Sequence, residues 1–297
     1  MGLLSRLSLH SVLFLVLALV LGFNYVWAKI GLNHMGAPEV VFLRVVFGLL
    51  PLAAIGFWRR ELAWAHWRHW PHLVVLSLLT ATLYYLFFKW GIARLGSGIA
   101  GAISGATPLV AFVGTALFLR DEVISRGKVL GLVLGVIGIV VLAQPWASWG
   151  EDGARDPLGV LAVLGASVCM GVAFVYSRRF VAPLAIPSVS LVTYSLALSL
   201  VMVAPFTDFG LIAATSGKVG VMLAVIIGSG VLGTGLAVYI YHELVRQWGA
   251  IPASSSTLPP PVVGLALGWL VLREDIGLLD VFATGLILAG VVLLRRD

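Results

Sequence analysis

The sequence predicts an all-α polytopic membrane protein with ten transmembrane helices, arranged as two inverted five-helix repeats. Hydrophobic residues make up 60% of the 297 positions and charged residues only 11%, whereas soluble domains carry roughly 25% charged residues. The chain contains ten apolar runs of spanning length, and a motif near the end of the fourth run recurs near the end of the ninth. We therefore expect lipid, rather than water, to surround most of the surface.

The ten runs follow from the length that a helix needs to cross lipid. About 20 apolar residues span a hydrocarbon core ~30 Å thick, and charged residues, Pro, Gly and Trp bound each run. The predicted spans cover residues 10–30, 38–58, 71–93, 97–119, 129–147, 157–177, 187–206, 218–242, 251–272 and 278–294. Ten such helices with short loops leave no room for a large soluble domain.

The basic residues predict the orientation of these spans. With the N-terminus inside, twelve of the nineteen Lys and Arg residues lie at cytoplasmic ends and six at outer ends. Lys and Arg in short loops favour the cytoplasm, so we expect a cell-membrane protein, in a bacterial inner membrane, with both termini cytoplasmic. Because the basic residues are spread over loops and form no stripe, nucleic-acid binding is not expected.

An internal repeat divides the chain. Residues 107–122 align without gaps on residues 260–275, an offset of 153, and an acidic pair follows the shared arginine in both copies. Each half then contains five spans, and an odd number of spans reverses orientation. We therefore predict inverted repeats at residues 1–150 and 151–297, joined by the polar segment 151–157.

Prolines stand halfway along both spans of the repeated motif. Pro108 lies in the fourth span, and residues 259–261 of the ninth span are all proline. Each proline lacks the N–H that would pair with the carbonyl four residues earlier, so Pro108 frees that of Ser104. Free backbone groups at this depth are tolerated where they are buried or line a wet cavity. We therefore expect the prolines of both spans to border a substrate site near the midplane. The alternative is that they form two structural kinks, whose free backbone groups are satisfied by neighbouring helices.

Three cations lie inside or close to the predicted spans. Lys29 ends the first span, Arg44 lies about two turns into the second and Lys89 lies late in the third. Intramembrane cations are candidates for binding an anionic group, such as an amino-acid carboxylate. For Lys29 and Lys89 we expect snorkelling to the interface. For Arg44, which lies deeper, we expect a partner or a cavity.

Other residue types limit the function. All thirteen Asp and Glu residues fall in loops or within about two turns of a span end, so no midplane proton relay is visible. There is no phosphate-binding loop, no metal cluster and no His or Asp placed to activate a mid-span Ser. The single Cys169 excludes an intramolecular disulfide. We expect no enzyme activity, no metal and no cofactor.

Several motifs resemble those of the drug/metabolite transporter superfamily, in particular its ten-span EamA-type family. Gly22, Asn24, Tyr25 and Lys29 resemble the family's Trp-Gly-x-Asn-Phe/Tyr-x-x-x-Lys pattern, with Leu21 in place of the Trp. Arg44 resembles its second-span arginine. Residues 108–122 and 261–275 resemble its proline-to-Gly-Glu signature, although Asp121 and Arg273 replace the glycine.

The resemblance implies two inverted five-helix repeats around a central cavity, alternating access and export of amino acids or other small metabolites. We therefore expect a secondary transporter for a small molecule, embedded in the bilayer as a monomer or homodimer. Two alternatives stay open: a translocase for amphiphilic or lipid-linked cargo, and a non-transporting membrane scaffold. The expected substrate-binding residues are Asn24, Tyr25, Lys29, Arg44, Tyr85, Ser104, Pro108, Tyr239, Ser256, Thr257, Pro260 and Pro261.

Overall fold

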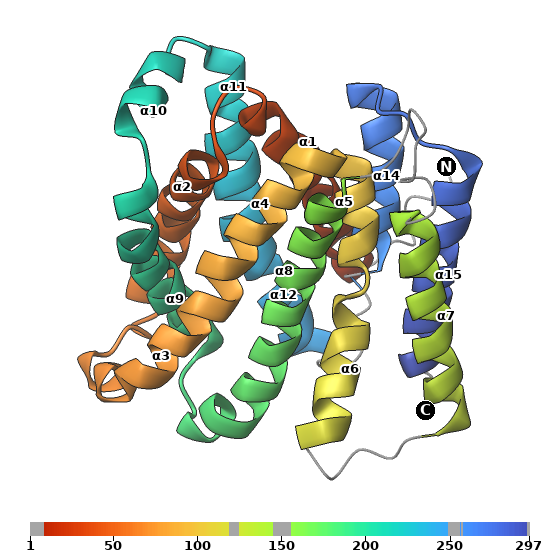
Figure 1. Ribbon diagram of the computed structural model, residues 1–297. Helices are drawn as coiled ribbons and strands as arrows, with labels where there is room; N and C mark the ends of the chain where they lie inside the picture. Colours follow the sequence, from red (N-terminus) through yellow and green to blue (C-terminus); the bar gives the residue numbers. More distant parts are fainter. Residues whose placement is uncertain (1–8, 119–124, 145–155, 249–255, 257, 296–297) are drawn as a thin grey trace, which may run out of the picture.

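The computed structural model describes residues 9–118, 125–144, 156–248, 256 and 258–295, and all regular elements within them are helices (Figure 1). The first half contains α1 (Leu9–Leu32), α2 (Ala37–Trp58), η2 (Trp64–His69), α3 (Trp70–Ser77), η3 (Leu78–Thr82), α4 (Leu83–Leu95), α5 (Ser97–Ser104), α6 (Thr107–Phe118) and α7 (Arg126–Ala143). The second half contains α8 (Pro157–Tyr176), η5 (Ser177–Val181), η6 (Ala182–Leu184), α9 (Ser188–Val203), η7 (Ala204–Phe206), α10 (Phe209–Thr215), α11 (Val219–Leu223), η8 (Ala224–Leu236), α12 (Ala237–Trp248), α14 (Pro259–Leu272) and α15 (Leu278–Arg295).

Eight of the described helical segments are long and apolar enough to cross a membrane, and two shorter apolar helices, Pro259–Leu272 and Leu278–Leu294, follow them. Most of the predicted spans agree with these segments to within a few residues. The ninth does not: its helix begins at Pro259 instead of residue 251, and residues 251–255 lie outside the described part. Three consecutive prolines explain the start, because a proline fits the first helical turn and disrupts the interior.

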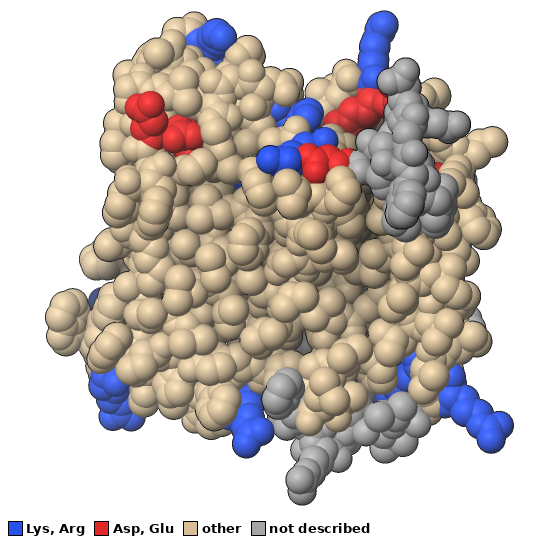
Figure 2. All heavy atoms as spheres, viewed as in Figure 1, with Lys and Arg blue, Asp and Glu red and all other residues tan. Residues whose placement is uncertain are grey.

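The surface is consistent with a lipid environment. On the face shown in Figure 2, charged side chains gather at two opposite ends, and the band between them consists almost entirely of uncharged residues. Large apolar side chains such as Leu161, Val201 and Leu270 are more than 60% exposed. Water would oppose this exposure, whereas lipid does not. The chain is therefore a multi-pass membrane protein.

Helices from the two halves pack against each other throughout the molecule. α7 runs along α15 (Figure 1), α5 packs on α14, and α2 packs on both α9 and η8. α1 contacts α14 and η8, while α8 contacts α6 and α4. Contacts between the two halves therefore form much of the interior.

Glycines and one carboxylate hold the crossing of α5 and α14 together. Gly268 is so close to α5 that an added Cβ would lie 3.1 Å from the Gly98 nitrogen. The Glu274 carboxylate accepts hydrogen bonds from the backbone N–H groups of Ser97, at 2.6 Å, and Gly98, at 2.8 Å. These are orphan donors of the first turn of α5, and a negative charge there is favourable. Gly96, at φ 88°, supplies the left-handed turn that precedes them.

Candidate functional site

The proline in the fourth span marks a helix break. α5 ends at Ser104, a two-residue turn follows, and α6 begins at Thr107 with Pro108 in its first turn. The missing N–H costs little at this position, because the first donors of a helix have no intrahelical acceptor. The freed carbonyl of Ser104 accepts a hydrogen bond from the Thr107 hydroxyl at 2.9 Å. Pro108 therefore lies near the middle of the span, as predicted, and at a helix break, but the carbonyl that it frees is paired.

The prolines of the ninth span also begin a helix. Pro260 and Pro261 occupy the first turn of α14, and both are buried. Ser256 is completely buried, and Thr257 lies outside the described residues. A Cβ on Gly105 would lie 3.4 Å from Cγ of Pro261. The break between α5 and α6 therefore faces the start of α14.

Tyr25 lies where α1 meets these two helices. Its hydroxyl is 3.2 Å from Oγ of Ser104. An added Cβ on Gly264 would come within 2.2 Å of the Tyr25 ring, and one on Gly101 within 3.0 Å. The ring also packs edge-on against Phe88 of α4, with 5.7 Å between centroids. The absence of two side chains thus creates the space that this tyrosine occupies.

Arg44 is buried in the interior and is surrounded mainly by neutral groups. Its Nη1 donates a hydrogen bond to Oδ1 of Asn24 at 3.3 Å, and its Cζ lies 4.1 Å from the ring centroid of Tyr85. The same Asn24 oxygen accepts a hydrogen bond from the Ser229 hydroxyl at 2.8 Å. The Arg44 Nε, in contrast, has no hydrogen-bond partner. The structure therefore brings the predicted site residues Asn24, Arg44 and Tyr85 together with Ser229. With Lys89, described below, these residues form what we call the Arg44 cluster.

The Arg44 cluster is close to π-helical segments. Ser229 belongs to η8, a π-helical stretch, and a second π-helical stretch, η3, directly precedes α4. Shifted by the repeat offset of 153, residues 78–82 fall on residues 231–235, inside η8. Such segments are rare and occur often at functional sites.

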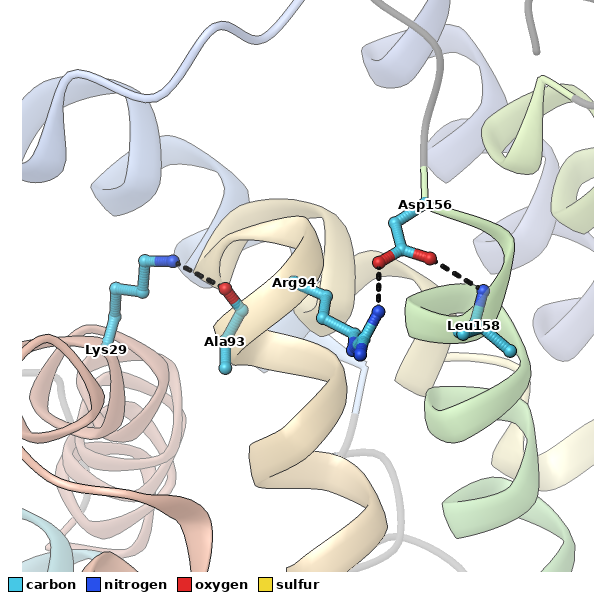
Figure 3. A network of polar contacts seen from close by, with 5 residues as sticks. All are labelled: Lys29, Ala93, Arg94, Asp156 and Leu158. Carbon is cyan, nitrogen blue, oxygen red and sulfur yellow. Dashed lines mark hydrogen bonds and ion pairs between the residues drawn. The ribbon is translucent and has the colours of Figure 1, made fainter.

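Lys29 points away from the Arg44 cluster. Its Nζ donates to the backbone carbonyls of Ile92 and Ala93, both at 3.3 Å, in the last turn of α4 (Figure 3). The last carbonyls of a helix are orphan acceptors at the negative end of its dipole. This contact ties α1 to α4 near the ends of both helices.

Arg94 and Asp156 connect the same end of α4 to α8. Figure 3 shows the Arg94 guanidinium paired with the Asp156 carboxylate, whose other oxygen accepts a hydrogen bond from the Leu158 N–H. The hydrogen bond from Arg94 holds the pKa of Asp156 below its usual range, and the Leu158 N–H acts in the same direction. Both contacts favour the ionised carboxylate.

Lys89 does not snorkel, and this prediction was wrong. Its side chain is 0% exposed, and its Nζ has no hydrogen-bond partner. Along α4 it shares the buried face with Tyr85, Phe88 and Ile92, whereas Trp90 is exposed. Residues spaced three and four apart lie on one side of a helix. Lys89 therefore faces the protein interior and cannot reach the interface along the lipid side.

Tyr239 lies outside the Arg44 cluster. It follows Ser229 by ten residues along η8 and α12, and its ring centroid is 5.5 Å from Cζ of Arg59, just beyond the end of α2. At about 1.5 Å per residue, this separation is roughly 15 Å along the helix. The structure therefore does not place Tyr239 with the other predicted site residues.

The sequence reasoning missed Lys89 as an interior cation and did not consider Ser229 or Phe88. Tyr84, stacked on Phe88 with 5.8 Å between centroids, adds another aromatic ring. The cluster offers cations, an amide, hydroxyls and aromatic faces, which suit the binding of a polar molecule. Within the described residues, no group of three or more His, Cys, Asp or Glu side chains is arranged to hold a metal ion.

Comparison with protein families gives a match over almost the whole chain. The EamA-like transporter family matches residues 9–144 and again residues 157–296. An uncharacterized transporter of Archaeoglobus fulgidus is 22% identical over 285 residues, which cover 95% of this chain and 98% of the relative. A probable amino-acid metabolite efflux pump of Salmonella typhimurium is 27% identical, with 94% of this chain and 90% of the relative covered.

A solved structure has a similar fold. A crystal structure 20% identical in sequence superposes with a TM-score of 0.62 and covers 95% of this chain and 96% of its own. At this identity the similarity concerns the fold alone.

Proposed function

Because the chain belongs to the EamA-like transporter family, we propose that it is a secondary transporter that exports a small metabolite, such as an amino acid, by alternating access. The chain is a membrane transporter by family, and the relatives named above are transporters. The Salmonella relative, a probable amino-acid metabolite efflux pump, supports amino acids as the substrate class and export as the direction.

One observation carries the proposed mechanism: contacts between the two halves come in matched pairs. If the ten spans are numbered in chain order, exchanging each span with the one five places away reproduces the packing pattern. α1 contacts α14 as α8 contacts α6, α1 contacts η8 as α8 contacts α4, and α2 contacts η8 as α9 contacts η3. The spans of α2 and α9, of α5 and α14, and of α7 and α15 pair with their own equivalents.

This pattern is what a pseudo-two-fold axis in the membrane plane produces. It supports ten spans in two inverted repeats, residues 1–150 and 151–297, and it gives two equivalent bundles that can rock against each other. On this proposal, the Arg44 cluster and the helix breaks at Pro108 and Pro260 border the substrate path, because they lie between the two halves. Asn24, Tyr25, Tyr85 and Ser104 line it.

The proposed orientation has both termini in the cytoplasm of a bacterial inner membrane. On the face shown in Figure 2, the acidic side chains gather at one end, and the charged side chains coloured at the other end are Lys and Arg. An excess of Lys and Arg favours the cytoplasmic side. We propose a monomer or homodimer, with the substrate and the bilayer as its partners.

Reconstitution into proteoliposomes tests the function. Vesicles loaded with unlabelled amino acids should accumulate the labelled substrate by exchange, and Arg44→Gln should reduce this uptake at least tenfold with the protein still folded. Since Cys169 is the only cysteine in the sequence, Cys169→Ala gives a cysteine-free protein. Single cysteines introduced into it can then be labelled with a thiol reagent added to one side of the membrane or the other. A cysteine introduced at Ser104 should change the side of the membrane from which it is labelled when substrate is added.

Each alternative function predicts a different result in the same vesicles. A lipid translocase would scramble labelled phospholipids without an added metabolite. A scaffold would transport none of the metabolites and would gain no thermal stability from any of them. Full exchange by Arg44→Gln, with an unchanged protein level, would remove the Arg44 cluster from the transport path.

A further inference from the structure

Lys89 is a buried basic residue whose amino group has no partner among the described residues. Its side chain is 0% exposed, and neither a hydrogen bond nor an ion pair reaches its Nζ among the described residues. An unpaired ammonium in a low-dielectric interior is among the costliest arrangements a protein can keep. In membrane proteins, such a residue is a functional candidate, and its missing counter-charge has to come from elsewhere.

A second cation with an incomplete set of partners is near. The Arg44 guanidinium stacks on Tyr85, and Lys89 follows Tyr85 by about one helical turn on the same buried face of α4. The charge of Arg44 acts on Lys89. Arg44 is 6% exposed, and its Nε is unpaired. Among the described residues, its guanidinium donates a hydrogen bond to the neutral side chain of Asn24.

Four carboxylates of the described residues have partners away from Arg44 and Lys89. Glu274 caps α5, Glu39 accepts from the backbone N–H of Asp208 at 2.8 Å, and Asp156 pairs with Arg94. Asp280 accepts from the backbone N–H of Gly277 at the start of α15. Neither Arg44 nor Lys89 has an ion-pair partner within the described part of the chain. Two basic side chains therefore lie close together without an acidic partner among the described residues.

We propose that Arg44 and Lys89 together bind the acidic groups of the substrate, and that the substrate is a small organic acid with two carboxylates. This proposal rests on the proposed transport function and narrows its substrate class. One carboxylate would match each cation, which removes the cost of both unpaired charges. Acidic amino acids and dicarboxylic acids without an amino group share this chemistry.

The neighbouring groups fit such a ligand. Asn24 and Ser229 provide neutral polar contacts beside Arg44, and the ring of Tyr85, on which Arg44 stacks, packs with those of Tyr84 and Phe88. Exclusion of water strengthens the attraction between a carboxylate and a cation. The same surroundings disfavour a cationic substrate, which would meet two positive charges in a low-dielectric space.

The experiment compares four substrates and four proteins. Proteoliposomes containing wild type, Lys89→Gln, Arg44→Gln or the control Lys218→Gln are tested for exchange of glutamate, succinate, leucine and lysine. Lys218 is exposed and contacts His34 outside the Arg44 cluster. Wild type and control should exchange glutamate or succinate at least tenfold faster than leucine or lysine. Each cluster variant should lose at least nine-tenths of that exchange.

The glutamate and succinate arms separate the two possible sources of the two carboxylates. Exchange of glutamate but not of succinate identifies acidic amino acids, and exchange of succinate but not of glutamate identifies acids without an amino group. Lys89→Arg keeps the charge, so it should retain more exchange than Lys89→Gln. Folding of every variant is checked by size-exclusion elution and melting temperature in detergent.

A binding assay separates failure of this proposal from failure of the transport function. Millimolar glutamate or succinate should raise the melting temperature of wild type by several degrees and leave that of Lys89→Gln unchanged. If this shift occurs without exchange, the anion site stands and the transport function fails. If wild type exchanges only leucine or lysine, and Lys89→Gln does so equally well, transport stands and the anion site is overturned. Absence of both shift and exchange overturns both.

Discussion

The crossing of α5 and α14 and the Arg44 cluster differ in whether their charged groups have partners. At the crossing, the Glu274 carboxylate satisfies two backbone donors of α5, and glycines let the two helices touch. In the Arg44 cluster, Arg44 Nε and Lys89 Nζ remain unpaired. A structural contact lowers the free energy of the folded chain by itself, whereas an unpaired cation raises it. This difference supports a structural role for the first region and the proposed ligand binding for the second.

The largest predicted effect is the loss of stability that follows disruption of the crossing of α5 and α14. Gly268→Val should lower the free energy of unfolding by about 3 kcal/mol, the upper end for overpacking a dense contact. The new Cβ would lie 2.5 Å from Oε2 of Glu274 and 3.1 Å from the backbone of Gly98. It would therefore push apart the two helices and the carboxylate that caps α5. Thermal unfolding in detergent measures the loss.

Gly285→Val is the matched control for Gly268→Val. A Cβ on Gly285 of α15 would meet no atom within 4 Å. This variant should melt close to the wild-type temperature, because both substitutions place the same residue in a helix and differ in the space around it. Equal losses in the two variants would show that helix propensity, and not the crossing, determines the result.

The next effect has the opposite sign and concerns the cation site. Lys89→Met should raise the free energy of unfolding of the ligand-free protein by about 1–3 kcal/mol, because it removes a buried group with no partner. The length and apolar stem of the side chain are largely kept. The melting temperature without substrate should therefore rise as exchange is lost. A fall in the melting temperature would mean that the ammonium contributes to the fold.

Much of the fold could be predicted because its signals are local. Apolar length and flanking Pro, Gly and charged residues determine where spans begin and end, and most predicted spans agree with the helices to within a few residues. The prolines of the ninth span begin their helix instead of lying halfway along it. A proline indicates that a helix is interrupted, but whether it kinks the helix or begins a new one depends on the turn before it, as at residues 105–106.

The candidate site was only partly predictable, because it depends on which side of a helix faces the interior. Depth along the span, read from the sequence, suggested that Lys89 could snorkel. Its direction could not be read, since both faces of α4 are apolar: Phe88 and Ile92 are buried while Phe87 and Trp90 are exposed. The contact between Asn24 and Ser229 joins residues 205 positions apart. No local pattern specifies such a pair.

The smallest predicted effect concerns an ion pair that is partly exposed. It tests whether a polar contact must be buried, and not only paired, to contribute strongly to the stability of the fold. Asp156 and Arg94 are each about one-third exposed, so water and salt screen their attraction. Asp156→Asn keeps an effective N-cap for α8 and removes the charge. We expect it to lower the melting temperature at pH 7 by a degree or less, well below the effect of Gly268→Val.

The pH dependence of this small effect follows from the sign of the pKa shift. Arg94 lowers the pKa of Asp156 in the folded protein, so the unfolded chain binds this proton more readily. The contribution to stability is therefore complete above the ordinary aspartate pKa of about 3.9 and is lost as the pH falls through the lowered value. The difference between wild type and Asp156→Asn should therefore disappear in acid. A difference that stays constant down to that acidic range would show that Asp156 acts as a cap alone, and that its charge adds nothing to the pairing of α4 with α8.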